Sequence, residues 1–107
     1  MTLPILTRLL PPPTSAEREE RFVPLLQTER LQLEQIVSHG QASPEGFWYD
    51  QPRPEWVVLL RGTARLQFDE GDQALVAGDA VLIPAHCLHR VAECSQDAVW
   101  LALHFQA

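Results

Sequence analysis

Two side chains that can bind a metal ion or move a proton, Glu55 and His89, stand at the starts of two segments with the pattern of strands. Glu55 precedes the apolar run of residues 56–60. His89 follows an apolar segment that ends at Pro84, where a loop leads into the next strand. A carboxylate at the start of an apolar strand is costly to bury alone, so it needs a cation, a metal or hydrogen-bond donors nearby. We therefore expect Glu55 and His89 to meet inside one small β-barrel.

Further polar side chains lie where they can join this pair. Tyr49 and Gln51 are two residues apart, so they share one face of a strand. A tyrosine hydroxyl beside a carboxylate can act as an acid or as an orienting donor. His86 lies on the loop at the expected mouth of the barrel, and His104 on the last strand. An inward His104 would complete a set of two histidines and one carboxylate, which suits non-heme iron or manganese.

The elements that must position these residues have the pattern of antiparallel strands. Polar and apolar residues alternate from Arg30 to His39 and, most cleanly, from Thr63 to Phe68. Further strands are expected at residues 47–51, 56–60, 73–77, 80–83, from 89 onward and at 98–105. About eight short strands with turns every eight to twelve residues are typical of a β-sandwich or closed barrel. The apolar residues expected to fill it are Trp56, Val58, Leu60, Ala64, Leu66, Phe68, Val81, Ile83, Val91, Trp100 and Leu103.

The chain divides into an N-terminal segment, residues 1–30, and one β domain, residues 31–107. Prolines interrupt residues 1–16, which predicts an arm lying on the surface or on a partner subunit. Ser15 is a plausible N-cap before an acidic stretch, so we expect a short helix that ends at about Val23.

Composition excludes several classes of function. The chain has 107 residues and a formal charge of −6, it contains no lysine, and its arginines are scattered. Surfaces that bind nucleic acid or anionic membranes need grouped cations, so neither partner is expected. No apolar run reaches the length of a membrane span, and no signal peptide is evident. Cys87 and Cys94 form neither a disulfide framework nor a cysteine zinc site, and we expect a cytoplasmic protein.

Two spacings in the chain resemble the motifs of the cupin superfamily. Glu55 followed after six residues by Gly62 is similar to the second half of the first cupin motif. Gly78, Pro84 and His89 fall on the second motif, in which His86 replaces a glycine. The resemblance covers about residues 31–105 and is closest to small single-domain cupins. It implies an all-β fold, a double-stranded β-helix or jelly-roll barrel with a short N-terminal arm or helix.

The resemblance also implies a divalent metal such as Fe, Mn, Ni or Zn. In the family, two histidines of a His-x-His pair, a glutamate and a later histidine bind the ion. Here the His-x-His positions fall on Tyr49 and Gln51 at the shorter motif spacing, or on Trp48 and Asp50 at the longer one. We favour the shorter spacing because residues 51–66 then align without a gap. The implied metal ligands are Gln51, Glu55 and His89, and the implied substrate-binding residues are Tyr49, His86 and His104.

Two functions follow from this resemblance as hypotheses. The first is a metal-dependent enzyme, an oxygenase or isomerase, that acts on a small polar molecule inside the barrel. The second is a metal-free cupin that binds or senses a small molecule without turnover. Small cupins commonly pair, and the apolar arm would suit an exchanged segment, so we expect a homodimer.

Overall fold

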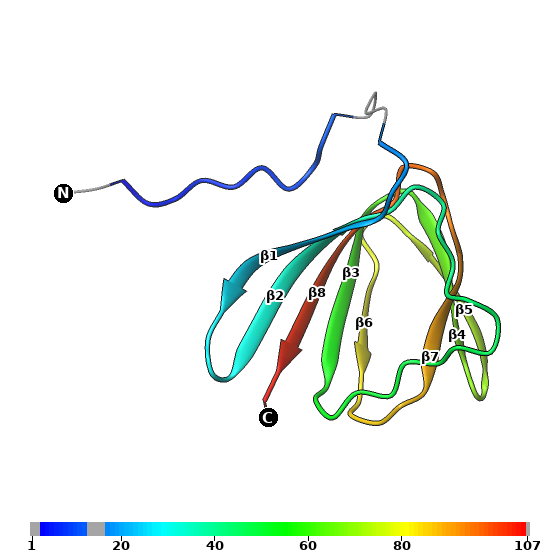
Figure 1. The fold of residues 1–107 in the computed structure, drawn as a ribbon. Helices are drawn as coiled ribbons and strands as arrows, with labels where there is room; N and C mark the ends of the chain where they lie inside the picture. The colour runs from blue at the N-terminus through cyan, green and yellow to red at the C-terminus, as the bar shows by residue number, and fades with distance from the viewer. Residues whose placement is uncertain (1–2, 13–16, 107) are drawn as a thin grey trace.

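The computed structural model describes residues 3–12 and 17–106, and all its regular structure is antiparallel β (Figure 1). No helix occurs in these residues, so none is available to cross a membrane. The eight strands, in chain order, are β1 Arg21–Gln27, β2 Leu31–Val37, β3 Glu55–Arg61, β4 Thr63–Phe68, β5 Gly71–Val76, β6 Ala80–Ile83, β7 His89–Cys94 and β8 Val99–Phe105.

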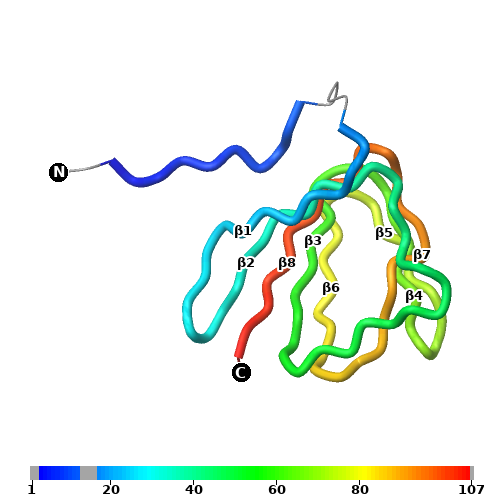
Figure 2. The backbone as a smooth tube through the Cα atoms, viewed as in Figure 1, coloured from blue at the N-terminus to red at the C-terminus, as the bar shows by residue number. Residues whose placement is uncertain are grey.

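The strands form two sheets that face each other as a jelly-roll barrel. The larger sheet has the order β1-β2-β8-β3-β6, and the smaller one has the order β5-β4-β7. The tube in Figure 2 shows the long segment between β2 and β3 running beside β7 before it returns to the larger sheet. Backbone hydrogen bonds from Ser43 to Val91 and between Tyr49 and His89 hold this segment against β7. The segment therefore closes one side of the barrel beside His89.

The core lies between the two sheets, and the direction of β3 differs from the prediction. Val57 and Leu59 are buried, whereas Trp56 is 43% exposed. The reason is the two-residue period of a strand, because an inward Glu55 brings Val57 and Leu59 inward with it and turns Trp56, Val58 and Leu60 outward. The expected core positions that are buried are Ala64, Leu66, Ile83 and Trp100.

Two predicted elements are wrong. Residues 17–20 are not helical, and Arg21 to Val23 belong to β1, which pairs with β2. The expected N-cap Ser15 lies outside the described residues. Residues 47–51 form no strand, because only Tyr49 pairs with a neighbour, in an isolated bridge to His89. That single bridge nevertheless fixes Tyr49 beside His89.

The root of the N-terminal arm is attached to the outer face of the larger sheet. The Gln35 side chain donates a hydrogen bond to the Leu9 carbonyl, and Arg61 Nη1 donates to the Pro11 carbonyl at 2.7 Å. Farther out, Leu3 and Ile5 are 90% and 94% exposed, and Figure 1 shows this part of the arm leading away from the barrel. The arm thus has a fixed root and an apolar, uncovered tip.

Candidate functional site

Glu55, His89 and His104 converge inside the barrel from both sheets. Glu55 is the first residue of β3 and lies directly opposite His104 of β8 in the strand register. Glu55 Oε2 is 3.2 Å from His104 Nε2, and Glu55 Oε1 is 3.2 Å from His89 Nε2, which comes from β7 of the other sheet. Glu55 and His89 are only 8% and 5% exposed. One buried carboxylate therefore faces two imidazole nitrogens.

The hydrogen bond that His89 makes through Nδ1 determines whether its Nε2 atom carries a hydrogen. His89 Nδ1 lies 2.9 Å from the carbonyl oxygen of Cys87. A carbonyl oxygen can only accept, so Nδ1 carries a hydrogen and donates it. In neutral His89 the Nε2 atom then has a lone pair that faces Glu55, and two acceptors do not attract each other. A proton or a cation must lie between Nε2 and Oε1 to make this contact favourable.

The pKa values of both histidines reflect their carboxylate partners. Burial alone would lower the pKa of His89, but the hydrogen bonds to Glu55 and to the Cys87 carbonyl outweigh it and raise this pKa above its ordinary value. The Glu34 carboxylate raises the pKa of His104 most, burial opposes the rise, and Glu55 adds to it. Glu55 is nevertheless the nearer partner of His104, since Glu34 Oε1 lies 3.6 Å from Nε2. Both carboxylates thus favour a cation at His104.

Tyr49 and Gln51 line the same cavity, although the segment that carries them is not the strand that was expected. The Tyr49 ring stacks on the His89 imidazole, with centroids 5.3 Å apart and an angle of 24° between the planes. Burial, together with Glu20, Glu55 and Glu34, raises the pKa of Tyr49, so its hydroxyl remains protonated and can donate. Gln51 Oε1 is buried and has no hydrogen-bond partner among the described residues. An orphaned buried oxygen beside the cavity is available to a ligand or an ion.

His86 does not reach the cavity. Its side chain is exposed, and its Nδ1 lies 2.8 Å from Asp50 Oδ1 on the outside of the barrel. The backbone of His86 has a φ of 60°, a left-handed conformation that glycine adopts without strain. This conformation explains why the second motif has glycine where this chain has His86.

The cavity around the three converging side chains has a volume of about 180 Å³. Sequence reasoning missed several residues of its wall, above all the carboxylates Glu20 and Glu34. A signal for Glu34 was present, since it shares the parity of Ile36, which also lines the cavity. Glu20 carried no such signal, because it lies just before β1, where a helix was expected. The other missed residues of the wall include Phe22, Ser38, Gln41 and Ser43.

The fold and the site define the class of protein as a jelly-roll barrel with imidazole and carboxylate groups in its interior. Comparison with known proteins identifies the family within this class. Residues 33–104 match the family described as Cupin domain. The chain therefore belongs to the cupin family.

Solved structures support the same assignment. The chain is similar to a putative mannose-6-phosphate isomerase from Ralstonia eutropha JMP134, with 41% identity, a TM-score of 0.89, and coverage of 97% of this chain and 100% of that one. It also resembles in fold a cupin superfamily protein from Desulfitobacterium hafniense DCB-2, with 19% identity, a TM-score of 0.73 and coverage of 96% and 100%. An RmlC-like cupin from Shewanella frigidimarina has 17% identity, a TM-score of 0.69 and coverage of 87% and 81%. No curated protein sequence matches the chain significantly.

Proposed function

We propose that the protein binds a divalent metal ion through Glu55, His89 and His104 and takes a small polar molecule in the same cavity. The observation that carries this proposal is the approach of two imidazole Nε2 atoms, each at 3.2 Å, to the two oxygens of one buried carboxylate. Two histidines and a carboxylate are the donors that non-heme iron and manganese accept. Gln51, with its unpartnered oxygen in the same cavity wall, is the fourth donor.

Each of the two histidine–carboxylate pairs has the spacing of two ligands of one ion. Two ligands that lie about 2.1 Å from one ion at a right angle to each other are about 3 Å apart, close to the Nε2–carboxylate separations. Among the described residues, no group of three or more histidine, cysteine, aspartate or glutamate side chains is already arranged to hold a metal ion. Here the donors are paired with one another, so an ion would replace the proton between Nε2 and the carboxylate. Binding should therefore release protons.

The ion would supply Lewis acidity toward an oxygen of the bound molecule. The chain itself contributes the rest of the site. Cys87 fixes the His89 tautomer through its carbonyl, the Tyr49 hydroxyl can donate a hydrogen bond to a ligand oxygen, and Val57, Leu66 and Ile83 keep the base of the cavity apolar. These contributions favour binding of a small molecule out of bulk water.

A second candidate is a metal-free site, in which a shared proton joins His89 to Glu55. The 3.2 Å separation is also that of a hydrogen bond, and neither alternative placement of the His-x-His motif gives a histidine. Such an acid–base pair could move a proton in an isomerase, the activity in the name of the Ralstonia protein. Both candidates use the pair of Glu55 and His89, and metal content distinguishes them.

Elemental analysis of protein purified without an affinity tag or chelator distinguishes these candidates. The first predicts near-stoichiometric iron, manganese, nickel or zinc, and loss of that metal in the Glu55→Ala/His89→Ala variant. A matched control is Glu70→Gln, in the exposed turn between β4 and β5, which should keep the metal. Protein that stays metal-free after incubation with each ion would refute the first candidate and support the second.

We also propose that two copies of the chain pair through the N-terminal arm. The arm leaves the barrel from an anchored root, and its tip exposes Leu3, Ile5 and Leu6, apolar side chains that cover nothing in one copy. Exposed apolar side chains in succession favour burial against another surface. A second copy offers that surface on β1, an edge strand with Phe22 and Leu26 exposed.

A further inference from the structure

The wall of the site cavity is rich in acidic groups and poor in basic ones. It includes three carboxylates, from Glu20, Glu34 and Glu55, and the imidazoles of His89 and His104. The chain has no lysine, and none of its arginines lines the cavity among the described residues. Even with both imidazoles protonated, or with neutral imidazoles and one divalent ion, the carboxylates leave the cavity with a negative net charge. An anionic ligand would meet repulsion there.

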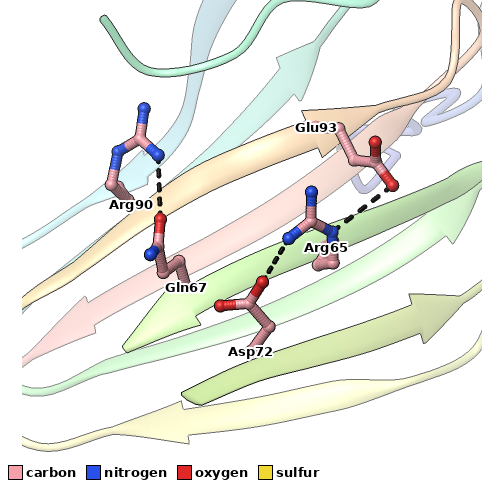
Figure 3. Close-up of polar contacts among 5 residues, drawn as sticks. All are labelled: Arg65, Gln67, Asp72, Arg90 and Glu93. Atoms are coloured by element: carbon pink, nitrogen blue, oxygen red, sulfur yellow. Dashed lines mark hydrogen bonds and ion pairs between the residues drawn. The ribbon is translucent and has the colours of Figure 1, made fainter. Parts of the chain in front are cut away.

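The arginines are held elsewhere. Arg65 and Arg90 lie on the outer face of the smaller sheet, where Arg65 pairs with Asp72 and Glu93, and Arg90 donates to Gln67 at 2.9 Å (Figure 3). Strand alternation explains their position, because their neighbours in sequence point into the barrel.

Two further arginines, Arg61 on β3 and Arg53 in the segment before it, also form hydrogen bonds outside the cavity. Arg61 donates to the Pro11 carbonyl, and Arg53 Nη2 lies 3.4 Å from Gln32 Oε1. Arg53 is near enough to oppose the charge on His104, but it does not line the cavity. A phosphate or carboxylate group of a ligand would therefore find no guanidinium there.

The carboxylates that the proposed metal site does not use are placed to hold a cation. Glu20 Oε2 accepts a hydrogen bond from Ser38 Oγ at 2.6 Å, which orients the carboxylate and leaves its other oxygen without a side-chain donor among the described residues. Glu34 Oε1 lies 3.6 Å from His104 Nε2, within ion-pair distance of a protonated imidazole, and its other oxygen has no side-chain partner among the described residues. An ammonium group has three donors and no acceptor, which matches such acceptors.

The aromatic side chains and the volume of the cavity limit the kinds of ligand that can bind there. Phe22, Tyr49 and Trp100 line the cavity, and aromatic faces attract ammonium groups. The volume of about 180 Å³ equals that of about six molecules of liquid water and is below the usual range of pockets for drug-sized ligands.

We infer that the cavity takes a small molecule that carries an ammonium group, bound by Glu20 and Glu34 and packed against the aromatic wall, and that it rejects phosphorylated ligands. This inference rests on the proposed function only in that the same cavity binds a small molecule. It does not require that a metal is present, because neither Glu20 nor Glu34 is among the three proposed metal ligands; Glu34 does contact one of them, His104.

Isothermal titration of the full chain with three probes tests the inference. The probes are 3-aminopropan-1-ol, the neutral propane-1,3-diol, and inorganic phosphate. The amino alcohol should bind about tenfold more tightly than the diol, or better, since hydrogen bonds to charged groups are worth about that ratio. Phosphate should not bind. The double variant Glu20→Gln/Glu34→Gln should lose the preference for the amino alcohol, whereas Glu70→Gln should keep it.

Each outcome bears on the inference separately from the metal site. Absence of amino alcohol binding, equal affinity for amino alcohol and diol, or tighter binding of phosphate would overturn it. So would an unchanged preference in the double variant. Circular dichroism of both variants shows that they are folded, and the single variants Glu20→Gln and Glu34→Gln replace the double variant if it is not. Metal content, measured on the same samples, reports on the proposed metal site whatever the probes do.

Discussion

Replacing Glu55 by alanine should destabilise the metal-free protein strongly at low pH and weakly at high pH. The substitution removes a buried carboxylate that contacts both His89 and His104 at 3.2 Å. Removing one partner of a buried ion pair costs about 3–5 kcal/mol, because the remaining charge is left without compensation. We expect a loss of this size in the free energy of unfolding at pH 6, where both histidines of the wild type are positively charged.

The pH dependence follows from the raised pKa values of the two histidines. A raised pKa in the folded state gives stability that is fully present below the ordinary value of 6.5 and is lost as pH rises through the folded-state values. Without Glu55, burial disfavours the charged imidazole of His89, so the variant should gain stability over the same interval. The difference between wild type and variant should therefore shrink as pH rises from 6 to 8.5.

Urea unfolding followed by tryptophan fluorescence, at several pH values and with chelator present, measures this difference. Glu70→Gln is the control for removal of a carboxylate, since Glu70 is exposed in a turn, and it should change stability little at any pH. A loss in Glu55→Ala that is the same at pH 6 and pH 8.5 would refute the assignment of Glu55 as the shared partner of the two histidines. A loss that grows with pH would refute it more strongly.

Four further variants test the fold and the proposed dimer. Leu59→Ala, at a side chain that is 0% exposed in the core, should cost about 2–5 kcal/mol in urea unfolding, and a loss below 1 kcal/mol would contradict the inward direction of β3. Gly62→Ala should cost more than about 1 kcal/mol, because φ is 87° and a Cβ would collide with the Ser95 hydroxyl and lie 3.1 Å from Ala98 Cα. Gly46→Ala, with φ of 79° and no atom within 4 Å of its Cβ, should cost less, and equal losses would show that the close contact at Gly62 is unimportant. The double variant Leu3→Asp/Ile5→Asp should convert a dimer to a monomer in light scattering, and a dimer that persists would refute pairing through the arm.

The fold was largely predictable from local patterns. Alternation marked β4, and Gly78 and Pro84 bounded β6, so the barrel strands from β3 onward follow from the sequence. The two errors arose where local signals and tertiary contacts disagree. Residues 17–23 have a helical start signal, but β2 offers β1 an edge with which to pair. Residues 47–51 have the composition of a strand, yet only Tyr49 has a neighbour in register.

The candidate site was predictable where a motif or the strand period carries the information. Glu55 and His89 belong to this group, whereas Tyr49 and Gln51 line the cavity from a segment that is not a strand. The sequence left two alternatives for His104, inward or outward, because β8 is apolar on both faces. The register of β8 with β3 places His104 opposite Glu55 and so on the inner face. Glu34 was missed although its shared parity with Ile36 carried a signal. Glu20 was missed because it reaches the cavity through the path of the chain before β1, which no local pattern predicts.

The most direct test of the metal proposal is anomalous diffraction from crystals of tag-free protein soaked in Mn²⁺, recorded on both sides of the manganese absorption edge. We expect one peak about 2.0–2.2 Å from His89 Nε2, His104 Nε2 and a Glu55 oxygen. A cavity without a peak, in which His89 Nε2 still lies 3.2 Å from Glu55, would contradict the metal site. The contact between these two side chains would then be a hydrogen bond through a shared proton.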